Sequence, residues 1–447
     1  MRLTWVQPED LLLHAFVQAR SEGADVSALE REWVQAGGAL DVPVSGAAQV
    51  PADPEQRAVA VRLLDAVDGL APARPAQLPA VLDRLAGVQA PAVPSVDELT
   101  RRIHGAWLGR CAGCLLGKPV EKIPRAGIEE ILHGTGRWPL ADWFTASGLP
   151  PEVAARWPWN RRSAPTSLAE NIDGMPEDDD LNFAVLALRM LQQHGSAIST
   201  DDVAQAWLDN LPGGRVFTAE RVAYRNLLEG VEPERAALVR NPFREWIGAL
   251  IRADVHGWVN PGDLRSAVAT AFTDARLSHT GAGVEGALWA AALASAAVVC
   301  HDVDDVLGLA GHVLEPDGSL GRAVLRGAEL GRGPLSDEAA LDALHAEFGS
   351  LHWVHVLNNA ATIAFALARG AGDFGRSIAL AVTAGWDTDS VGATVGGVVG
   401  ALLGADGIPP RWTDPLDNRL ATSLPGPAEL AIERLAHETV ALAGAAR

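Results

Sequence analysis

Carboxylates gather at two points of this 447-residue chain, each directly before an apolar pattern of helical period. The first cluster is the run Glu177, Asp178, Asp179 and Asp180, and the second contains Asp387 and Asp389. One or two acids suffice to cap a helix, where they accept hydrogen bonds from free backbone N–H groups. Four consecutive acids repel one another, and a bound cation relieves that repulsion most simply.

Together the two clusters offer enough hard oxygen ligands for one or two Mg²⁺ or Mn²⁺ ions. The predicted ligands are five carboxylates and one hydroxyl: Glu177, Asp178, Asp179, Asp387, Asp389 and Ser390. Such ions would orient and activate a water molecule for attack on a polarised centre. Zinc is disfavoured because no Cys or His lies close in sequence to either cluster. Two alternatives stay open: plain helix capping, and a metal-free acid and base pair acting on a glycosidic bond.

The residues that follow each cluster predict the helix that carries it. Apolar side chains recur at the spacing of one helix face over residues 181–191 and 391–402. Period-two runs of β-branched residues are scarce, and the chain holds a single Tyr. The sequence therefore predicts an all-α, compact multi-helix domain, and the lack of a fixed-period repeat argues against a solenoid.

Glycines form a stripe along the second of these helices, at Gly392, Gly396, Gly400 and Gly404. Each glycine costs a helix interior about 1 kcal/mol relative to alanine. Four in succession therefore predict that another backbone or a ligand comes very close to this face. Tight helix packing is the favoured interpretation.

The main domain is predicted to begin at residue 95, where Ser95 and Glu98 have the spacing of a helix capping box. Prolines punctuate residues 72–94 just before it. We expect residues 1–94 to be an accessory helical region, helical near 10–21 and 56–67, followed by a Pro-rich linker. Residues 95–447 would then be the catalytic domain.

Composition limits the partners of the chain. With 36 Lys and Arg against 56 Asp and Glu, the formal charge of −20 argues against a grip on nucleic acid or on an anionic membrane. Three cysteines cannot form a disulfide framework, and Glu9 and Asp10 fall where a secretory signal would be apolar. The longest apolar stretches, 287–300 and 391–405, are shorter than the roughly 18 to 20 residues that span a bilayer. We expect a cytoplasmic protein.

At the acidic clusters the sequence resembles the ADP-ribosylglycohydrolase family, which includes dinitrogenase-reductase-activating glycohydrolase and the ADP-ribosyl-acceptor hydrolases. Five segments carry the resemblance, in the family's order: a Gly-rich opening helix over 105–121, the acidic run 177–180, a Gly-rich loop over 248–252, residues 277–280 before an Ala-rich helix, and the closing residues 385–390 with 408–412.

The resemblance implies an all-α fold with a binuclear Mg²⁺ site. Glu177, Asp178 and Asp179 would bind one ion and Asp387, Asp389 and Ser390 the other, with Asp389 bridging the two. The ions would hold the ribose hydroxyls and a water that attacks the anomeric carbon. On this basis we predict Glu121 and Asp179 as catalytic residues. The residues predicted to contact substrate are Gly113, Trp246, Gly248, Arg252, His279 and Trp386.

Several positions depart from the family pattern. Glu177 and Asp180 stand where the family usually has hydroxyl residues, so the site carries extra negative charge. Cys114 replaces a common Asp, and Ile247 replaces an Asn. Trp386 replaces a Gly beside the metal ligands, where its indole would narrow the pocket or stack on a base or sugar.

Three further features of the sequence have more than one interpretation or lie near the predicted site. The segment 156–162 holds three Arg and two Trp, which suits either a loop that binds a diphosphate and adenine or a pinned surface loop. Asn358 and Asn359 are either core amides or residues that order the metal ligands. Cys111 and Cys114 have C-x-x-C spacing without a second pair, and we interpret them as small core residues.

Three functions fit these residues. The leading one is a metal-dependent hydrolase of an N- or O-glycosidic bond at the anomeric carbon of an ADP-ribosyl group, acting on an ADP-ribosylated protein or a small ADP-ribosyl compound. The second is an N-glycosidase for another riboside or nucleoside-like molecule, motivated by Asp180 and Trp386. The third is a non-catalytic ADP-ribose-binding protein, but the chain keeps every carboxylate at the predicted metal positions, which argues against this function.

Overall fold

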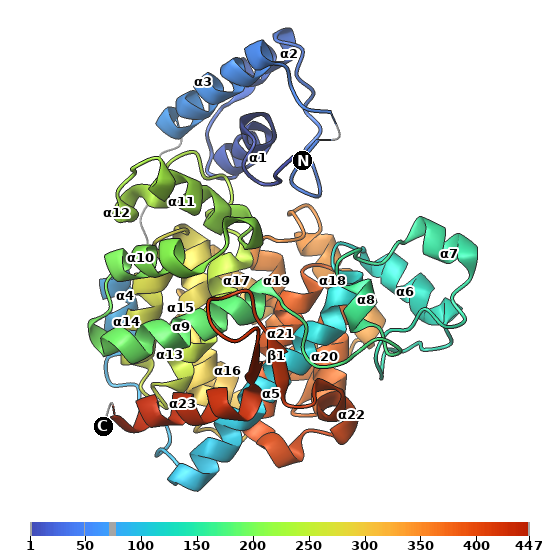
Figure 1. Cartoon of the computed structure of the whole chain (residues 1–447), viewed down its shortest axis with the longest axis vertical. Helices are drawn as coiled ribbons and strands as arrows, with labels where there is room; N and C mark the ends of the chain where they lie inside the picture. Colours follow the sequence, from blue (N-terminus) through green and yellow to red (C-terminus); the bar gives the residue numbers. More distant parts are fainter. Residues whose placement is uncertain (1, 49, 71–76, 446–447) are drawn as a thin grey trace.

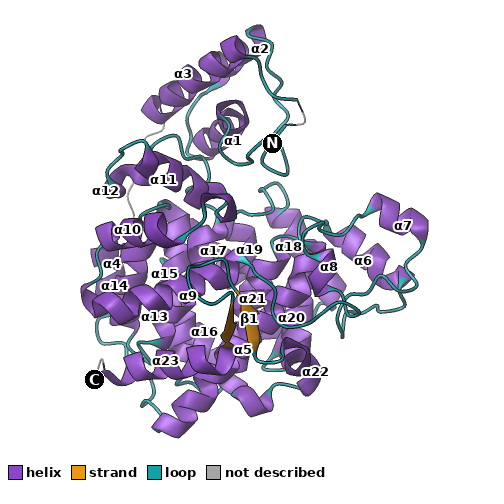
Figure 2. Ribbon diagram, viewed as in Figure 1, coloured by secondary structure: helices purple, strands orange, loops and turns teal. Residues whose placement is uncertain are grey.

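Helices dominate the computed structural model, which describes residues 2–48, 50–70 and 77–445 (Figure 2). Its two strands, β1 (Arg419–Ala421) and β2 (Glu429–Ala431), pair antiparallel. The predicted all-α class is thereby confirmed. No helix in the described ranges combines the length and the apolar content needed to cross a membrane.

Three helices form an N-terminal unit at one end of the molecule (Figure 1): α1 (Pro8–Ser21), α2 (Ser27–Gln35) and α3 (Pro54–Leu70). The helices expected near 10–21 and 56–67 are α1 and α3. A short helix, α4 (Leu78–Arg84), lies within the segment expected to be a Pro-rich linker, whose residues 72–76 fall outside the described residues.

The remaining helices form the body, with α6, α7 and α8 projecting to one side (Figure 1). The first part comprises α5 (Val96–Gly117), α6 (Arg125–Gly134), α7 (Pro151–Arg156), α8 (Ala164–Ser167), α9 (Asp179–His194), α10 (Thr200–Asn210), α11 (Thr218–Leu228), α12 (Pro233–Ala236), α13 (Asp254–Trp258) and α14 (Leu264–Ala275). The second part comprises α15 (Gly281–Ala297), α16 (Val303–Gly311), α17 (Ser319–Arg332), α18 (Asp337–Phe348), α19 (Val356–Gly370), α20 (Phe374–Thr383), α21 (Thr388–Leu403), α22 (Pro410–Thr413) and α23 (Ile432–Ala445). Short 3₁₀ turns connect several of them: η1 (Lys118–Val120), η2 (Gly195–Ala197), η3 (Gly213–Arg215), η4 (Ile247–Arg252), η5 (Ala405–Gly407) and η6 (Asp414–Leu416).

Two glycine stripes bring the central helices α5 and α21 into backbone contact. A β-carbon on Gly113 would overlap the carbonyl oxygen of Gly392, and one on Gly109 would overlap that of Gly396. Gly105 faces Gly400 in the same way, so the stripes run antiparallel. Close packing without side chains fixes how far the two helices can slide along each other. The tight packing predicted for the α21 glycines is confirmed.

Helix α5 begins where the sequence predicts. The Ser95 hydroxyl accepts a 3.3 Å hydrogen bond from the Glu98 N–H. The Glu98 carboxylate accepts from Arg101 and Arg102, at 2.8 and 2.7 Å, so it pairs along the helix. At its other end α5 leads through Gly117 directly into η1, and this places the residues after 117 beside the start of α21.

The segment before α9 is held by the chain's C-terminal part. Met175 forms a parallel bridge with Leu420 of β1, with hydrogen bonds of 2.8 Å from Met175 N–H to the Arg419 carbonyl and 2.9 Å from Ala421 N–H to the Met175 carbonyl. This pairing fixes the direction in which the acidic run enters α9.

The N-terminal unit packs on the body through both apolar and charged contacts. The Trp5 ring lies edge-on to Phe243 and Trp246, with centroid distances of 5.5 and 5.6 Å. Glu22 pairs with Arg244 at 2.7 Å. These contacts place Thr4 and Trp5 at a cleft that the start of α9 also lines.

Candidate metal centre and substrate cleft

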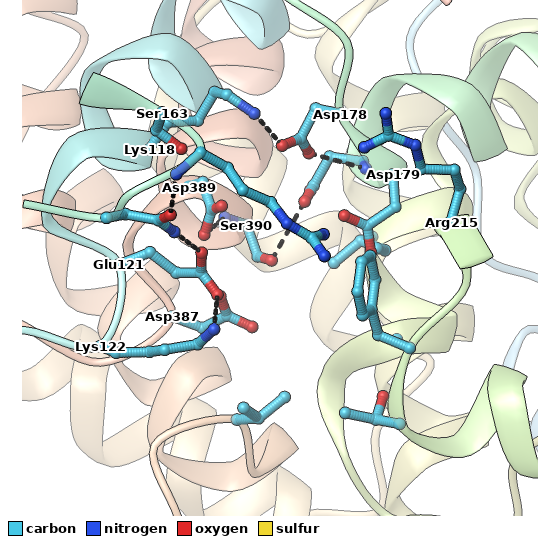
Figure 3. Close-up of a pocket in the computed structure, with 18 of the residues that line it drawn as sticks. Lys118, Glu121, Lys122, Ser163, Asp178, Asp179, Arg215, Asp387, Asp389 and Ser390 are labelled. Atoms are coloured by element: carbon cyan, nitrogen blue, oxygen red, sulfur yellow. Dashed lines mark hydrogen bonds and ion pairs between the residues drawn. The ribbon is translucent and has the colours of Figure 1, made fainter. Parts of the chain in front are cut away.

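Both acidic clusters face one cleft of about 980 Å³ (Figure 3). Glu177, Asp178 and Asp179 line it from the start of α9, and Asp387, Asp389 and Ser390 from the start of α21. Glu121, which follows η1, also lines the cleft. The structure therefore brings together all six residues predicted as metal ligands and both residues predicted as catalytic.

Helix capping positions the acids of the first cluster. Asp178 is the N-cap of α9, and its Oδ1 accepts a 3.0 Å hydrogen bond from the Asp180 N–H. Asp179 is the first helical residue and faces the cleft (Figure 3). Asp178 therefore caps the helix, whereas the next acid of the run faces the cleft.

A buried asparagine positions the second cluster. Gly385 turns the chain with φ of +77°, a conformation that favours glycine. The Asp387 N–H then donates a 3.2 Å hydrogen bond to Asn359 Oδ1, while Asn359 Nδ2 donates to the His355 carbonyl at 2.8 Å. The Asn359 side chain thus holds the backbone of Asp387, a predicted metal ligand.

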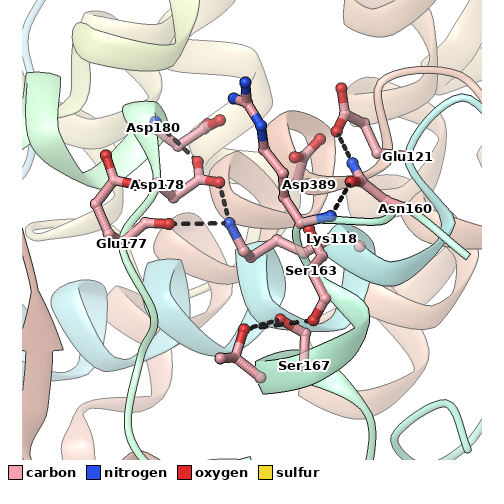
Figure 4. A network of polar contacts seen from close by, with 12 residues as sticks. Lys118, Glu121, Asn160, Ser163, Ser167, Glu177, Asp178, Asp180 and Asp389 are labelled. Carbon is pink, nitrogen blue, oxygen red and sulfur yellow. Dashed lines mark hydrogen bonds and ion pairs between the residues drawn. The ribbon is translucent and has the colours of Figure 1, made fainter. Parts of the chain in front are cut away.

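Glu121 has polar partners of its own at the edge of the cleft. Its carboxylate accepts a hydrogen bond from Asn160 Nδ2 (Figure 4) and pairs with Lys122 Nζ at 3.3 Å (Figure 3). Asn160 comes from the segment 156–162. These contacts hold Glu121 opposite the first acidic cluster.

Protein groups already neutralise three of the acids. Glu177 accepts from Asn182 at 2.8 Å and pairs with Arg215 at 3.1 Å. Asp178 pairs with Lys118, a buried lysine that points into the cluster (Figure 4). Asp180 lies 3.6 Å from the buried Arg110 guanidinium and accepts a 3.3 Å hydrogen bond from the Ser390 hydroxyl.

Three other acids have no such partner. Asp179, Asp387 and Asp389 make no ion pair with any Lys or Arg of the described residues. Burial, followed by the neighbouring acids Asp178 and Asp389, raises the pKa of Asp179 well above its usual value. Burial and the Asp389 charge do the same to the pKa of Asp387, and burial with Glu121 raises the pKa of Asp389 to about 7. Desolvated carboxylates without a cation are the donor set that a hard divalent ion fits.

A thiol lies behind this centre. Cys114 Sγ and carboxylate oxygens of Asp178 and Asp180 come within 4.8 Å of one another, and all three residues are buried. Burial, and then the two carboxylates, raise the pKa of the Cys114 thiol well above its usual value. The interpretation of Cys114 as a core residue fits its burial. Its two acidic neighbours lie more than sixty positions away along the chain, so no local pattern indicates their contact with Cys114.

Basic and aromatic side chains line the rest of the cleft. Arg161, Arg162 and Arg215 lie along it, and the Arg162 guanidinium stands 5.6 Å from the centre of the Phe217 ring. Trp353 is half-buried in the wall. From the segment 156–162, Arg161 and Arg162 reach the cleft, whereas Arg156 pairs with Glu130 outside its lining.

The N-terminal unit completes one wall. Thr4, Trp5 and Ser45 line the cleft. The Thr4 carbonyl accepts a 2.7 Å hydrogen bond from Arg221, and Trp353 Nε1 donates to the Val44 carbonyl at 2.9 Å. The accessory region therefore contributes surface to the site, although its sequence carries no recognisable motif.

Of the six residues predicted to contact substrate, only Gly248 lines the cleft. Gly113 packs against Gly392, and Trp246 stacks on His352 with a centroid distance of 4.3 Å. Trp386 is buried and stacks on His345 at 4.2 Å, so its indole does not narrow the cleft.

Arg252 and His279 also lie away from the cleft lining. Arg252 is buried between Glu220 and Asp274, with ion pairs of 2.5 and 2.6 Å. His279 Nδ1 shares a 2.8 Å hydrogen bond with Ser278, and the ring lines a separate cavity of about 230 Å³. In this structure, Arg252 therefore forms buried ion pairs and His279 a buried hydrogen bond, and neither side chain lines the cleft.

Residues 95–446 match the ADP-ribosylglycohydrolase family. Because this match covers most of the chain, the protein belongs to that family. Membership supports a hydrolase.

Two relatives illustrate the range of the likeness. The chain is 29% identical over 335 residues to an uncharacterized protein of Archaeoglobus fulgidus, covering 73% of this chain and 96% of that protein. It also resembles a solved structure described as an ADP-ribosylglycohydrolase-related protein complex, with a TM-score of 0.50 and 23% identity, covering 78% of this chain and all of that one. The solved structure supports the fold.

Proposed function

We propose that the protein is a Mg²⁺-dependent hydrolase that cleaves the anomeric bond of an ADP-ribosyl group. The observation that carries the proposal is the set Asp179, Asp387 and Asp389, three carboxylates that face one cleft and form no ion pair with a Lys or Arg of the described residues. Their oxygens suit Mg²⁺ or Mn²⁺. When bound, the ion would supply Lewis acidity to the ribose hydroxyls and to a water.

The surrounding side chains suit the rest of an ADP-ribosyl group. Arg161 and Arg162 offer guanidinium groups for a diphosphate, which arginine binds bidentately. Phe217 and Trp353 offer aromatic faces for an adenine base. The cleft therefore has an acidic end for a cation and ribose and a basic, aromatic region for the nucleotide.

Glu121 is the residue to which we assign proton transfer at the reacting bond. It lines the cleft, and its charge acts on both Asp387 and Asp389. Hydrolysis adds water across the bond between the anomeric carbon and the leaving group, so one proton must pass from the water to that group. The contacts with Asn160 and Lys122, which hold this carboxylate at the edge of the cleft, support the assignment.

The test compares acids inside and outside the cleft. Asp179→Asn and Asp387→Asn should each abolish Mg²⁺-dependent release of ADP-ribose from an ADP-ribosylated arginine or serine substrate while the circular dichroism stays unchanged. Asp173→Asn removes an exposed acid that pairs with Arg419, and should leave the rate intact. Full activity of either cleft variant, or of the wild type in excess chelator, would contradict the proposal. Faster turnover of simple ribosides would assign the same chemistry to another substrate.

A further inference from the structure

Lys118 lies inside the first acidic cluster, at the place where the resemblance implied one of two metal ions. The residue is only 5% exposed. Its Nζ donates to Asp178 Oδ2 and to the Glu177 carbonyl oxygen, the latter at 3.3 Å (Figure 4). An ammonium group thus lies between two oxygens of the run that was predicted to bind an ion.

The two acids beside Lys118 have no oxygen without a protein partner. Asp178 Oδ1 accepts from the Asp180 N–H at 3.0 Å, and its Oδ2 holds the ammonium. Glu177 Oε1 accepts from Asn182, and its Oε2 pairs with Arg215. At Asp178 Oδ2, a metal ion would have to take the place of the Lys118 ammonium, and at Glu177 it would meet a carboxylate already paired with Arg215.

The fold restrains Lys118 in this position. The residue follows Gly117, whose missing side chain lets the α5 backbone lie against Thr388 of α21. The Thr388 hydroxyl donates a 2.8 Å hydrogen bond to the Gly117 carbonyl. Removing the ammonium from Asp178 would leave a buried charge unpaired on each side, which is strongly unfavourable.

We propose that the Lys118 ammonium replaces one of two cations, so that the centre holds a single divalent ion on Asp179, Asp387 and Asp389. The inference rests on the proposed function. It departs from the binuclear site that the resemblance implied, because Glu177 and Asp178 are assigned to the chain's own cations. Repulsion between the ammonium and a second nearby ion acts in the same direction.

Metal stoichiometry tests the proposal without measuring turnover. The probe is Mn²⁺, titrated into the full chain by isothermal calorimetry and followed by electron paramagnetic resonance. The wild type should bind one Mn²⁺ per chain and give the spectrum of an isolated ion. Lys118→Met keeps the length of the side chain and removes its charge. It should bind two ions, whose spectrum shows the coupling expected of metals about 3.5–4 Å apart.

A neighbouring lysine provides the matched control. Lys122 lines the same cleft but is exposed and pairs with Glu121, so Lys122→Met should still bind one ion. Two ions bound by the wild type would overturn the inference and leave the proposed function standing. This result does not depend on whether Lys118→Met folds. A Lys118→Met variant that folds and binds one ion would also overturn it. No Mn²⁺ binding by the wild type would overturn both.

Discussion

The backbone N–H of Asp387 donates a 3.2 Å hydrogen bond to the side-chain oxygen of Asn359. Asn359 is completely buried on α19 and also donates to the carbonyls of His355 and Trp353. A single amide therefore connects the start of α21, which carries two of the three unpaired acids, to the helix beside it.

Replacing this amide should loosen the metal centre. Asn359→Ala leaves the Asp387 N–H without its partner, so we expect a stability loss of about 1–3 kcal/mol and a roughly 10- to 100-fold weaker Mn²⁺ affinity. Asn358→Ala, at an equally buried neighbour that donates to the His352 carbonyl, should lose stability with unchanged affinity. Urea unfolding and calorimetry measure the two effects. Equal Mn²⁺ affinities in both variants would contradict this role.

The glycine contact between α5 and α21 should tolerate no side chain. Gly113→Ala would force a methyl group into the Gly392 carbonyl, and neither helix backbone can move aside alone. We expect a loss of at least about 1–3 kcal/mol in the free energy of unfolding. Gly308→Ala is the control, because this helical glycine has open space around it and should gain about 0.5–1 kcal/mol. Equal stabilities of the two variants would show that the helices are not in close contact.

Arginines of one segment should differ in their effect on ligand binding. Arg162 lines the cleft, whereas Arg156 pairs with Glu130 outside it. If Arg162 holds the diphosphate, Arg162→Gln should raise the Kd for ADP-ribose by roughly 10- to 100-fold through the loss of charge-assisted hydrogen bonds. Arg156→Gln should bind like the wild type. The Kd values come from calorimetry, and a larger effect at Arg156 would remove the segment from the site.

Acid should weaken the junction between the N-terminal unit and the body. Burial lowers the pKa of His14 to about 4, and its ring lies 5.0 Å from Phe243. Between that value and the ordinary pKa near 6.5, the unfolded chain binds a proton that the folded chain excludes. Stability is therefore lost as the pH falls through this window, by about 2 kcal/mol at pH 5 from this residue.

The contribution of His14 can be isolated by substitution. In urea unfolding at pH 7 and pH 5, His14→Phe should lose about 2 kcal/mol less on acidification than the wild type. His133→Gln changes an exposed histidine and should keep the wild-type dependence. Parallel curves for the wild type and His14→Phe would assign the acid sensitivity elsewhere.

Local patterns in the sequence predicted the parts of this site that depend on local structure. Acids before an apolar helical period indicated where α9 and α21 begin, and the α21 glycines indicated a close partner. The pairing of Lys118 with Asp178 could not be predicted, because the two residues lie 60 positions apart and meet only when the end of α5 packs beside the start of α9. Arg252 and His279 were predicted as substrate contacts from their place in the family pattern. In the structure they serve buried ion pairs and hydrogen bonds, which have no distinct signature in sequence.

Three residues that line the cleft, Thr4, Trp5 and Ser45, lie outside the part of the chain that matches the family. The family match over residues 95–446 includes every acid of the proposed centre and leaves these three lining residues out. The residues to which we assign the chemistry therefore lie within the family unit, while part of the cleft wall comes from the N-terminal unit.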